Sequence, residues 1–382
     1  MSSGSNIRLA IFGCWNNYTG TLRPHSDFDY VSKYLTDNQH TYNELIILGD
    51  NYYPDKVPVI KSNGEKFVID GKQIKTAKYN KDELLLGFKA LESIRKPKFL
   101  IMGNHDLEDT LLNRDSCIGL KDELSAGISK RIKKIYPKFK DHKTPIITEY
   151  HIGSETKETD ELLPVATDLT KQFLIPFPYG SRDIQIGSIK YKYIFIDTNA
   201  YNLANPDITD IESTCFKVIG KTAYQVKVEQ EAFIRECFED STTNIFLVFG
   251  HQPLSSAKTS DGIIKKDTLF PKNELAELLL TSRKTIYYIC ADVHMFQHGI
   301  ITGYGHSLEQ IVCGTGGADM DNFTLHMQTI NKGTIDYELQ HVAPSYGFVD
   351  MILSDSGIRW TYYKIKEDAT REAYSMKYLI KY

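Results

Sequence analysis

Gly103-Asn104-His105-Asp106 follows directly on the apolar run Phe99–Met102. A short apolar run of this kind is typical of a buried strand. The residues after it offer an amide oxygen for a metal ion, an imidazole that can protonate or hydrogen-bond a departing oxygen, and a carboxylate that can fix the tautomer of that imidazole. Ligands bind outside the carboxyl ends of strands in open α/β sheets, so this stretch predicts a functional site at a sheet edge.

Other apolar runs end in residues of the same kind. Cys14 follows Ile7–Phe12, Asp50 follows Leu45–Leu48, His251 follows Ile245–Phe249, and Asp292 and His294 follow Ile286–Ile289. One aspartate or histidine after a strand is more often a turn residue than a ligand. Because such side chains recur at successive strand ends, we expect them to converge on one site. A helix predicted over about 26–38 completes a right-handed βαβ unit, which places Cys14 beside Asp50.

The stretch Gly49-Asp50-Asn51-Tyr52-Tyr53 places a carboxylate directly after a strand. The glycine before it permits a turn, and the phenol of Tyr53 comes three residues later. A carboxylate can bridge two cations, and a phenolate can bind a hard, highly charged ion such as ferric iron. The stretch therefore favours a metal centre, although a Gly-Asp pair after a strand is also common in turns.

The rest of the chain alternates between helical and strand patterns. Helices are predicted near 81–93, 226–239 and 272–280, and a strand at 192–196. Turn residues between 57–60 and 67–69 predict an inserted hairpin. Short apolar runs at 309–313, 346–353 and 359–365 predict an antiparallel sheet.

Composition limits the partners that charge alone can attract. The 382 residues are 41% hydrophobic and 25% charged, which is ordinary for a globular protein, and the formal net charge is -4. This charge argues against a protein that binds nucleic acid through its overall field. A lysine-rich stretch at 129–143 precedes an acidic one at 149–168, and mutual compensation or a solvated face is a better explanation than a nucleic-acid patch. Nucleic acid is thus a disfavoured partner.

The N-terminal stretch Met1–Asn6 is polar, and Ile7–Phe12 is too short for a secretory or membrane-spanning segment. We therefore expect a soluble cytoplasmic protein with no membrane partner. The six cysteines show no paired spacing, which favours reduced thiols. Cys290 and Cys313 lie in apolar runs and are expected to be buried.

Together these blocks resemble those of the calcineurin-like metallophosphoesterases, and most of all the purple acid phosphatases. Gly49–Tyr53 is similar to the GDNFY block of that family, Gly103–Asp106 to GNHD and Gly250–Pro253 to GHxP. Tyr287–His294 stands where the family has a strand followed by GHDH. The resemblance extends over nearly the whole chain, with supporting matches at 196–198, 311–317 and 346–348.

The resemblance implies an α/β fold, a four-layer α/β/β/α sandwich of two mixed β-sheets flanked by helices. It implies one phosphoesterase domain over residues 1–382, with insertions at about 54–79 and 107–179. It also implies two divalent or trivalent metal ions, of which iron, manganese or zinc are favoured. In the family a metal-bound hydroxide hydrolyses a phosphomonoester or phosphodiester, so a phosphate ester is the expected substrate. The oligomeric state is not specified.

Roles for individual residues follow from the same resemblance. Asp50 would bridge the two metals, Tyr53 and His294 would bind the first, and Asn104 and His251 the second. His105 would be catalytic, stabilising the transition state or protonating the leaving oxygen, and Asp106 would support it. Trp15 is expected to pack beneath the metal loop, and His298 and His306 are expected to be surface or turn histidines.

Two residues depart from the family pattern. Cys14 replaces the aspartate of the first motif, and Asp292 replaces the first histidine of GHDH. A thiolate is softer than a carboxylate and favours zinc or iron, whereas Asp292 is harder than imidazole and favours manganese, magnesium or iron. Alternatively, Cys14 stays uncoordinated and Asp292 turns toward a loop amide or a lysine. Three functions therefore compete. The first is a phosphoesterase with non-standard ligands Cys14 and Asp292, and the second is a catalytically weak or silent member with a structural or binding role. The third, ranked last, is a nucleic-acid or nucleotide hydrolase whose Lys130–Lys143 segment steers a polyanion to the site.

Overall fold

The computed structural model describes residues 6–17, 27–53, 90–106, 178–203, 220–260, 274–323 and 334–366. It also describes shorter pieces at 55–58, 64, 66, 68–69, 72–73, 75–78, 87–88, 150–152, 155–156, 173–174, 216, 263–267, 329–332 and 371–376. The predicted basic stretch at 129–143 and most of the acidic stretch at 149–168 lie outside the described residues. The two predicted insertions are described only in pieces.

The first sheet has seven strands of mixed direction. Their order is β10 (Phe173–Leu174), β7 (Lys98–Leu100), β2 (Glu44–Ile47), β1 (Ile7–Phe12), β21 (Gly347–Ser354), β22 (Gly357–Ile365) and β23 (Arg371–Met376). Strands β1, β2, β7 and β10 are parallel, while β21 pairs antiparallel with β1 and is followed by β22 and β23 in antiparallel order. The parallel strands β1, β2 and β7 carry the first three predicted site segments.

The second sheet has ten strands and is also mixed. Their order is β19 (Thr329–Lys332), β20 (Ile335–Ala343), β17 (Phe296–Gly303), β18 (His306–Cys313), β16 (Ile286–Cys290), β13 (Ile245–Phe249), β12 (Ile189–Phe195), β11 (Gly180–Ile186), β8 (Tyr150–Ile152) and β9 (Glu155–Thr156). Strands β12, β13, β16 and β18 run parallel. The segments that contain His251 and Asp292 follow β13 and β16, so they leave the same edge of this sheet.

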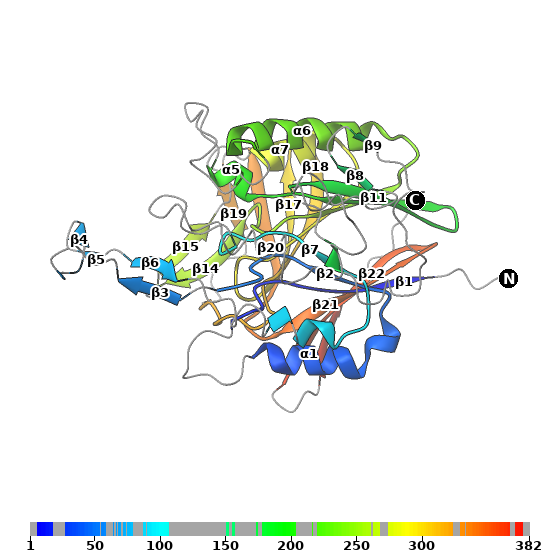
Figure 1. The fold of residues 1–382 in the computed structure, drawn as a ribbon. Helices are drawn as coiled ribbons and strands as arrows, with labels where there is room; N and C mark the ends of the chain where they lie inside the picture. Colours follow the sequence, from blue (N-terminus) through cyan, green and yellow to red (C-terminus); the bar gives the residue numbers. More distant parts are fainter. Residues whose placement is uncertain are drawn as a thin grey trace.

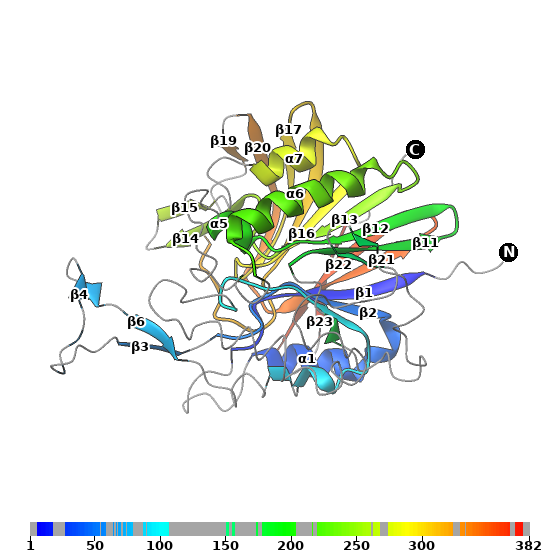
Figure 2. The same ribbon diagram turned by 45° about the horizontal axis from the view of Figure 1, so that its top comes forward.

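Helices cover the outer faces of the two sheets. Helix α1 (Phe28–Asp37) lies on the first sheet, and α6 (Ala223–Glu239) and α7 (Glu274–Thr281) lie on the second (Figures 1 and 2). The side chains of β1 alternate between two cores, because Ala10 and Phe12 pack with α1 whereas Leu9 and Ile11 pack between the sheets. A third core joins the second sheet to α6 and α7. The predicted four-layer sandwich is confirmed.

The local sequence explains where the main helices begin. In α1, Phe28, Val31 and Leu35 recur at helical spacing and are fully buried. Helix α6 begins at Ala223, three residues before the predicted start, because Thr222 and Gln225 form a reciprocal capping box. No helix among the described residues is both long and apolar enough to cross a membrane.

Short hairpins leave the sandwich next to the site segments. β3 (Asp55–Pro58) pairs with β6 (Lys75–Lys78), and β4 (Val68–Ile69) pairs with β5 (Lys72–Gln73). The predicted pairing of 57–60 with 67–69 is therefore wrong. Residues 55–58 pair with 75–78, and residues 68–69 pair with 72–73. β14 (Ser256–Ser260) and β15 (Ile263–Asp267) form another hairpin, and it projects from the same side of the molecule (Figure 1).

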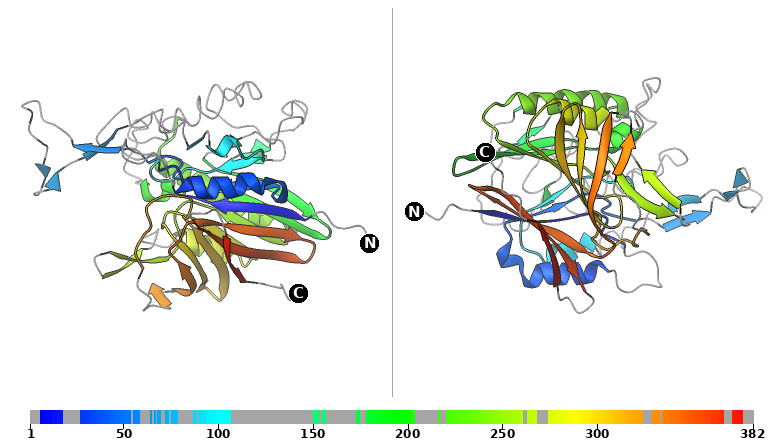
Figure 3. Two further views of the ribbon diagram at one scale, coloured as in Figure 1. Left: turned by 90° about the horizontal axis from the view of Figure 1, so that it is seen from below. Right: turned by 180° about the vertical axis from the view of Figure 1, so that it is seen from behind.

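Two expectations about the C-terminal part were wrong. The late strands do not form one antiparallel sheet, because β21 and β22 join β1 in the first sheet while β17, β18 and β20 extend the second (Figure 3). His298 is not a surface histidine, since it is fully buried in β17 and its Nε2 lies 3.0 Å from Glu309 Oε1. Periodicity marks strands but carries no information on their partners.

Candidate metal centre

The site segments begin with backbone turns that few residue types adopt. Cys14, Asp50 and Asp292 have φ values of 53°, 52° and 60°, which lie in the left-handed region. Each follows the end of a parallel strand, β1, β2 or β16. Such conformations cost free energy in residues with a Cβ and tend to cluster at functional sites. These three backbone conformations lower the stability of the fold, and they place the three side chains at one edge of the sandwich.

Two glycines allow the segments after β2 and β7 to approach each other closely. A Cβ on Gly103 would overlap Asp50 Oδ1 and the Asp50 backbone nitrogen. Gly49 has a φ of +84°, and a Cβ there would lie 2.6 Å from both Gly103 N and His251 Nδ1. Only glycine fits these positions without moving a neighbouring segment. The close approach brings Asp50 within reach of the second sheet.

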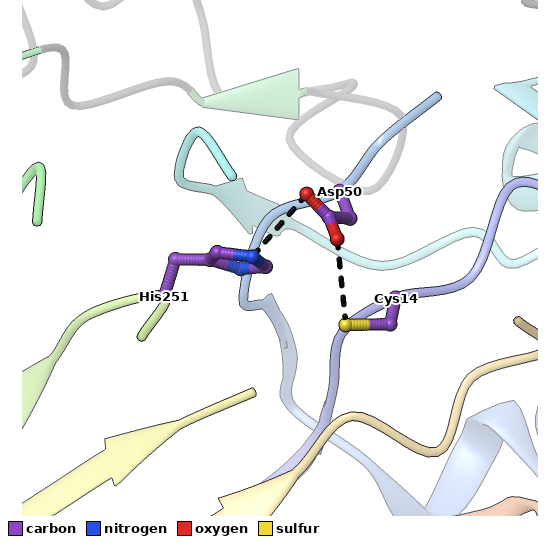
Figure 4. Close-up of side chains that lie close together, drawn as sticks. All are labelled: Cys14, Asp50 and His251. Carbon is purple, nitrogen blue, oxygen red and sulfur yellow. Dashed lines mark hydrogen bonds and ion pairs between the residues drawn. The ribbon is translucent and has the colours of Figure 1, made fainter. Parts of the chain in front are cut away.

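Asp50 lies at the centre of the site, with 1% of its surface exposed. Its Oδ2 accepts a hydrogen bond from the Tyr53 hydroxyl at 2.9 Å and lies 3.7 Å from Cys14 Sγ. Its Oδ1 accepts from the His105 backbone N–H at 3.0 Å and lies 3.2 Å from His251 Nε2 (Figure 4). The two carboxylate oxygens therefore face two different groups of side chains.

The group around Oδ1 is built on His251. This imidazole is fully buried, and its Nδ1 lies 2.6 Å from the Leu48 carbonyl oxygen. Its Nε2 lies 3.1 Å from Asn104 Oδ1 and 3.6 Å from Asp292 Oδ1. A carbonyl at Nδ1 keeps the proton there and directs Nε2 into the site, which is the usual arrangement of a metal-binding histidine.

The group around Oδ2 contains Cys14, Tyr53 and His294. The Tyr53 hydroxyl lies 3.1 Å from His294 Nε2. His294 Nδ1 lies 2.6 Å from the Asp319 carbonyl oxygen, so the second histidine is oriented in the same way as His251. Asp321 accepts from the His294 backbone N–H at 2.9 Å and fixes this segment.

His105 and Asp106 have distinct surroundings. The His105 ring centroid lies 4.5 Å from that of Tyr53, and both residues are partly exposed. Asp106 is buried, and its carboxylate accepts from the backbone N–H groups of Gly103 and Asn51 at 2.7 and 2.9 Å. These contacts hold the segments after β2 and β7 together. The suggestion that Asp106 fixes the His105 tautomer stays a prediction.

Asn51 is a residue whose importance sequence reasoning missed. It is fully buried, donates from Nδ2 to the Ile101 carbonyl at 2.9 Å, and accepts from Trp15 Nε1 at 3.1 Å. Trp15 packs against Phe28 with ring centroids 4.8 Å apart, so it lies beneath the metal loop as predicted. Asn51 directly follows Asp50, and this position next to a site residue is the signal that could have found it.

The charges of the site compensate one another. Burial opposes ionisation of Asp50, but the neighbouring His251 and His105 outweigh it and hold the pKa of Asp50 below its usual range. Burial lowers the pKa of His251, but Asp50 and Asp292 outweigh this and raise it to about 9. Burial, reinforced by Asp50, raises the pKa of Cys14 and of Tyr53. Without a metal ion the site therefore balances its carboxylates with a protonated His251.

The donor set fits a metal centre. One atom each of Cys14, Asp50 and His251 lies within 4.8 Å of the others, and all three side chains are buried. Sulfur, carboxylate, imidazole and phenol groups are ligands of zinc and iron. The described structure also brings Tyr53, Asn104, Asp292 and His294 to this cluster. Every residue predicted as a metal ligand thus lies at one site.

The structure has two mixed sheets with a cluster of metal-donor side chains along one edge. This combination is typical of a metallophosphoesterase. A model of the calcineurin-like phosphoesterase family matches residues 7–296, and the chain belongs to this family. Members of the family are metal-dependent phosphoesterases that generally hold two divalent metal ions. The resemblance seen in the sequence is confirmed.

Two solved structures resemble the chain at low sequence identity. No curated protein sequence matches the chain. Among solved structures, "GAP50 the anchor in the inner membrane complex of Plasmodium" is 15% identical, with 99% of this chain and 90% of that chain covered and a TM-score of 0.49. "Structure of PhoD" is 12% identical, with 97% and 68% covered and a TM-score of 0.48. At these values neither likeness bears on function.

Proposed function

We propose that this protein hydrolyses phosphate esters at a two-metal centre bridged by Asp50. The observation that carries the proposal is the division of contacts between the two Asp50 oxygens. Oδ2 faces Cys14 and Tyr53, whereas Oδ1 faces His251. A carboxylate between two donor groups is suited to bridge two cations.

Each donor group would hold one metal ion. The first would be bound by Cys14, Tyr53 and His294, the second by Asn104, His251 and Asp292. Thiolate and phenolate in the first set favour iron or zinc, and the oxygen-rich second set also suits manganese. The pKa of His251 is raised to about 9, so its imidazole is protonated below that pH. Because His251 must lose this proton to become a ligand, metal binding below about pH 9 should release a proton.

Metals bound at such a centre lower the pKa of water and offset charge on the phosphoryl oxygens. His105 then supplies what the metals cannot, a proton at the leaving oxygen. Its backbone N–H donates to Asp50 Oδ1 at 3.0 Å and its ring lies against Tyr53, so the imidazole lies beside the proposed bridging carboxylate. Asp106 and Asn51 position the loop, and Trp15 is buried and donates to Asn51.

Hydrolysis assays test the proposal most simply. Purified protein should hydrolyse aryl phosphates or nucleotide diesters when supplied with manganese, iron or zinc. His105→Asn should lower kcat by about 10²–10⁴, the usual contribution of a general acid. His306→Asn is the matched control, because this histidine lies at the start of β18 with its Nε2 2.8 Å from the Lys284 carbonyl. Absence of hydrolysis with every metal would contradict the proposal.

One observation favours a silent protein as the second candidate. Cys14 Sγ is fully buried beside Asp50, and both burial and this carboxylate raise the pKa of the thiol. A thiol that stays protonated would not replace the family's aspartate as a ligand. The double variant Cys14→Asp with Asp292→His decides between the candidates. Hydrolysis that appears only in the double variant would show that the native site is silent, whereas similar activity in both proteins supports the first proposal.

A further inference from the structure

Asn199 is a buried amide behind the site that sequence motifs do not mark. It is the first residue of α5 (Asn199–Leu203) and is 2% exposed. Its Nδ2 donates to Asp197 Oδ1 at 2.9 Å and to the Gly103 carbonyl oxygen at 3.2 Å. Its Oδ1 accepts from Gln252 Nε2 at 2.8 Å. One side chain thus connects three separate segments.

Two of those segments carry proposed metal ligands. Gly103 directly precedes Asn104, and Gln252 directly follows His251. Asn104 follows β7 of the first sheet, whereas His251 follows β13 of the second sheet. Their side chains meet with Asn104 Oδ1 3.1 Å from His251 Nε2. The Asn199 amide therefore spans the gap between the two sheets one residue away from this meeting point.

The network fixes which way the amide points. Nδ2 donates to Asp197 Oδ1 and to two backbone carbonyl oxygens, while Oδ1 accepts from an N–H donor. Gln252 is held in turn, since its Oε1 accepts from the Thr198 hydroxyl and its backbone N–H donates to the same hydroxyl. Only a primary amide of this length supplies a donor to one segment and an acceptor to the other.

We propose that Asn199 is a positioning residue that sets the separation between Asn104 and His251 and so determines the affinity of the second metal position. The claim about metal affinity rests on the proposed function. The claim that Asn199 positions the two loops applies to the metal-free chain as well. Partners that orient metal ligands typically change metal affinity by about 10- to 100-fold when removed. Loss of Asn199 should affect the second metal far more than the first, because the described hydrogen bonds of its side chain do not reach the segments of Tyr53 and His294.

The main test compares Asn199→Leu with Gln230→Leu. Leucine keeps the branched skeleton of the Asn199 side chain but neither donates nor accepts a hydrogen bond. Gln230 is an equally buried amide that bonds the backbone N–H and carbonyl of Asp197 at 2.8 and 3.3 Å, so it supports the neighbouring segment without a described contact to either ligand loop. Titration with Zn²⁺ should show the affinity of one of the two binding steps reduced about 10- to 100-fold in Asn199→Leu, and both affinities unchanged in Gln230→Leu.

A second readout needs no metal. Four backbone N–H groups within 102–106 and 250–253 have described hydrogen bonds, those of Gly103, His105, Gly250 and Gln252. In chelator-treated protein, hydrogen exchange at 102–106 and 250–253 should be faster in Asn199→Leu than in wild type or Gln230→Leu. Asn199→Asp, which keeps the acceptor for Gln252 but loses the donor to Gly103, should accelerate exchange at 102–106 more than at 250–253. This second variant also serves if Asn199→Leu does not fold.

The outcomes separate the two claims. Unchanged exchange in both loops, or equal acceleration in Gln230→Leu, would overturn the role of Asn199 whatever the metal content. Wild-type protein that binds fewer than two Zn²⁺ ions would overturn the proposed two-metal function instead, and the exchange data would then still decide whether Asn199 positions the loops. Equal weakening of both metal steps would contradict the assignment to the second position.

Discussion

At the scale of single residues, Asp50 combines features that stability alone does not explain. It has a left-handed backbone, it is buried, and its carboxylate faces a thiol, a phenol and an imidazole. The left-handed backbone and the burial of a charged group both cost free energy. A bridging role between two metal ions accounts for all of them together.

Cys14 is predicted to act as a thiolate ligand. In protein loaded with Co²⁺, a sulfur-to-metal charge-transfer absorption should appear in the near ultraviolet, because a bound cation stabilises the thiolate against the burial that raises its pKa. Cys14→Ser should abolish this absorption. Cys237→Ser, which alters another buried thiol in α6, should retain it. A spectrum without this absorption in wild-type protein would show that Cys14 is not a ligand.

Asp197 is predicted to make stability depend on pH. Burial raises its pKa to about 7, well above the 3.8 of the unfolded chain. Below pH 4 the carboxyl is protonated in both states, and between pH 4 and 7 only the unfolded chain ionises, so stability falls as pH rises. The loss approaches on the order of 4 kcal/mol above pH 7. Asp197→Asn should therefore gain stability over wild type as pH rises from 5 to 8, measured by denaturant unfolding with chelator present.

Asp240 provides the control for that measurement. Its pKa lies below the usual range because the Lys190 and Thr242 side chains outweigh the effect of burial. Its contribution to stability is lost only as pH falls below 4, so Asp240→Asn should have the same effect at pH 5 and pH 8. If Asp197→Asn showed the same flat behaviour, the proposed burial of an ionisable Asp197 would be wrong.

At the scale of elements, the loops after parallel strands form the site, and glycines determine how closely they approach. A Cβ on Gly103 would overlap Asp50, so Gly103→Ala should separate the loops after β2 and β7. We expect a loss of stability of about 1–3 kcal/mol, as for other overpacked sites. Metal binding should weaken as well, because Asp50 and Asn104 lie on the separated loops. Calorimetric metal titration and thermal unfolding measure the two effects.

Gly299→Ala is the matched control. A Cβ on Gly299 would overlap the Tyr337 ring within the second sheet, away from the metal ligands. This variant should lose stability but keep the metal affinity of wild type. Equal weakening of metal binding in both variants would indicate a general effect of instability rather than a role for the loop contact.

The elements could be predicted from the sequence more readily than their pairing. The strands Ile7–Phe12 and Ile245–Phe249 match the predicted runs, because strands buried on both faces are continuously apolar. The antiparallel pairing of β21 with β1 was not predictable in this way. It joins residues such as Ile7 and Leu353 that are far apart in the chain, and periodicity describes only neighbours in sequence.

Some residues of the candidate site could likewise be predicted from the sequence, and others could not. Asp50, Asn104 and His251 could be identified because each stands in a short motif at a strand end. Asn199 could not, because its role depends on contacts with segments that follow β7 and β13. Such side chains support ligands from outside any motif, and only the folded arrangement identifies them.

At the scale of the whole molecule, the two sheets meet at the candidate metal centre. The proposed ligands come from both sheets, Asp50 from the first and His251 from the second, so neither sheet forms the site alone. We propose that residues 1–382 form one domain with insertions at about 54–79 and 107–179. The pairing of β21 with β1 supports this, because it ties the chain after the family match at 7–296 into the first sheet.

The most direct test of the two-metal centre is the metal content of protein purified without chelator, measured by elemental analysis. We predict two ions per chain in wild type. Asp50→Asn, which weakens the bridge to both positions, should lower the content to less than one. One ion or none in wild type, or two ions retained in Asp50→Asn, would contradict a centre bridged by Asp50.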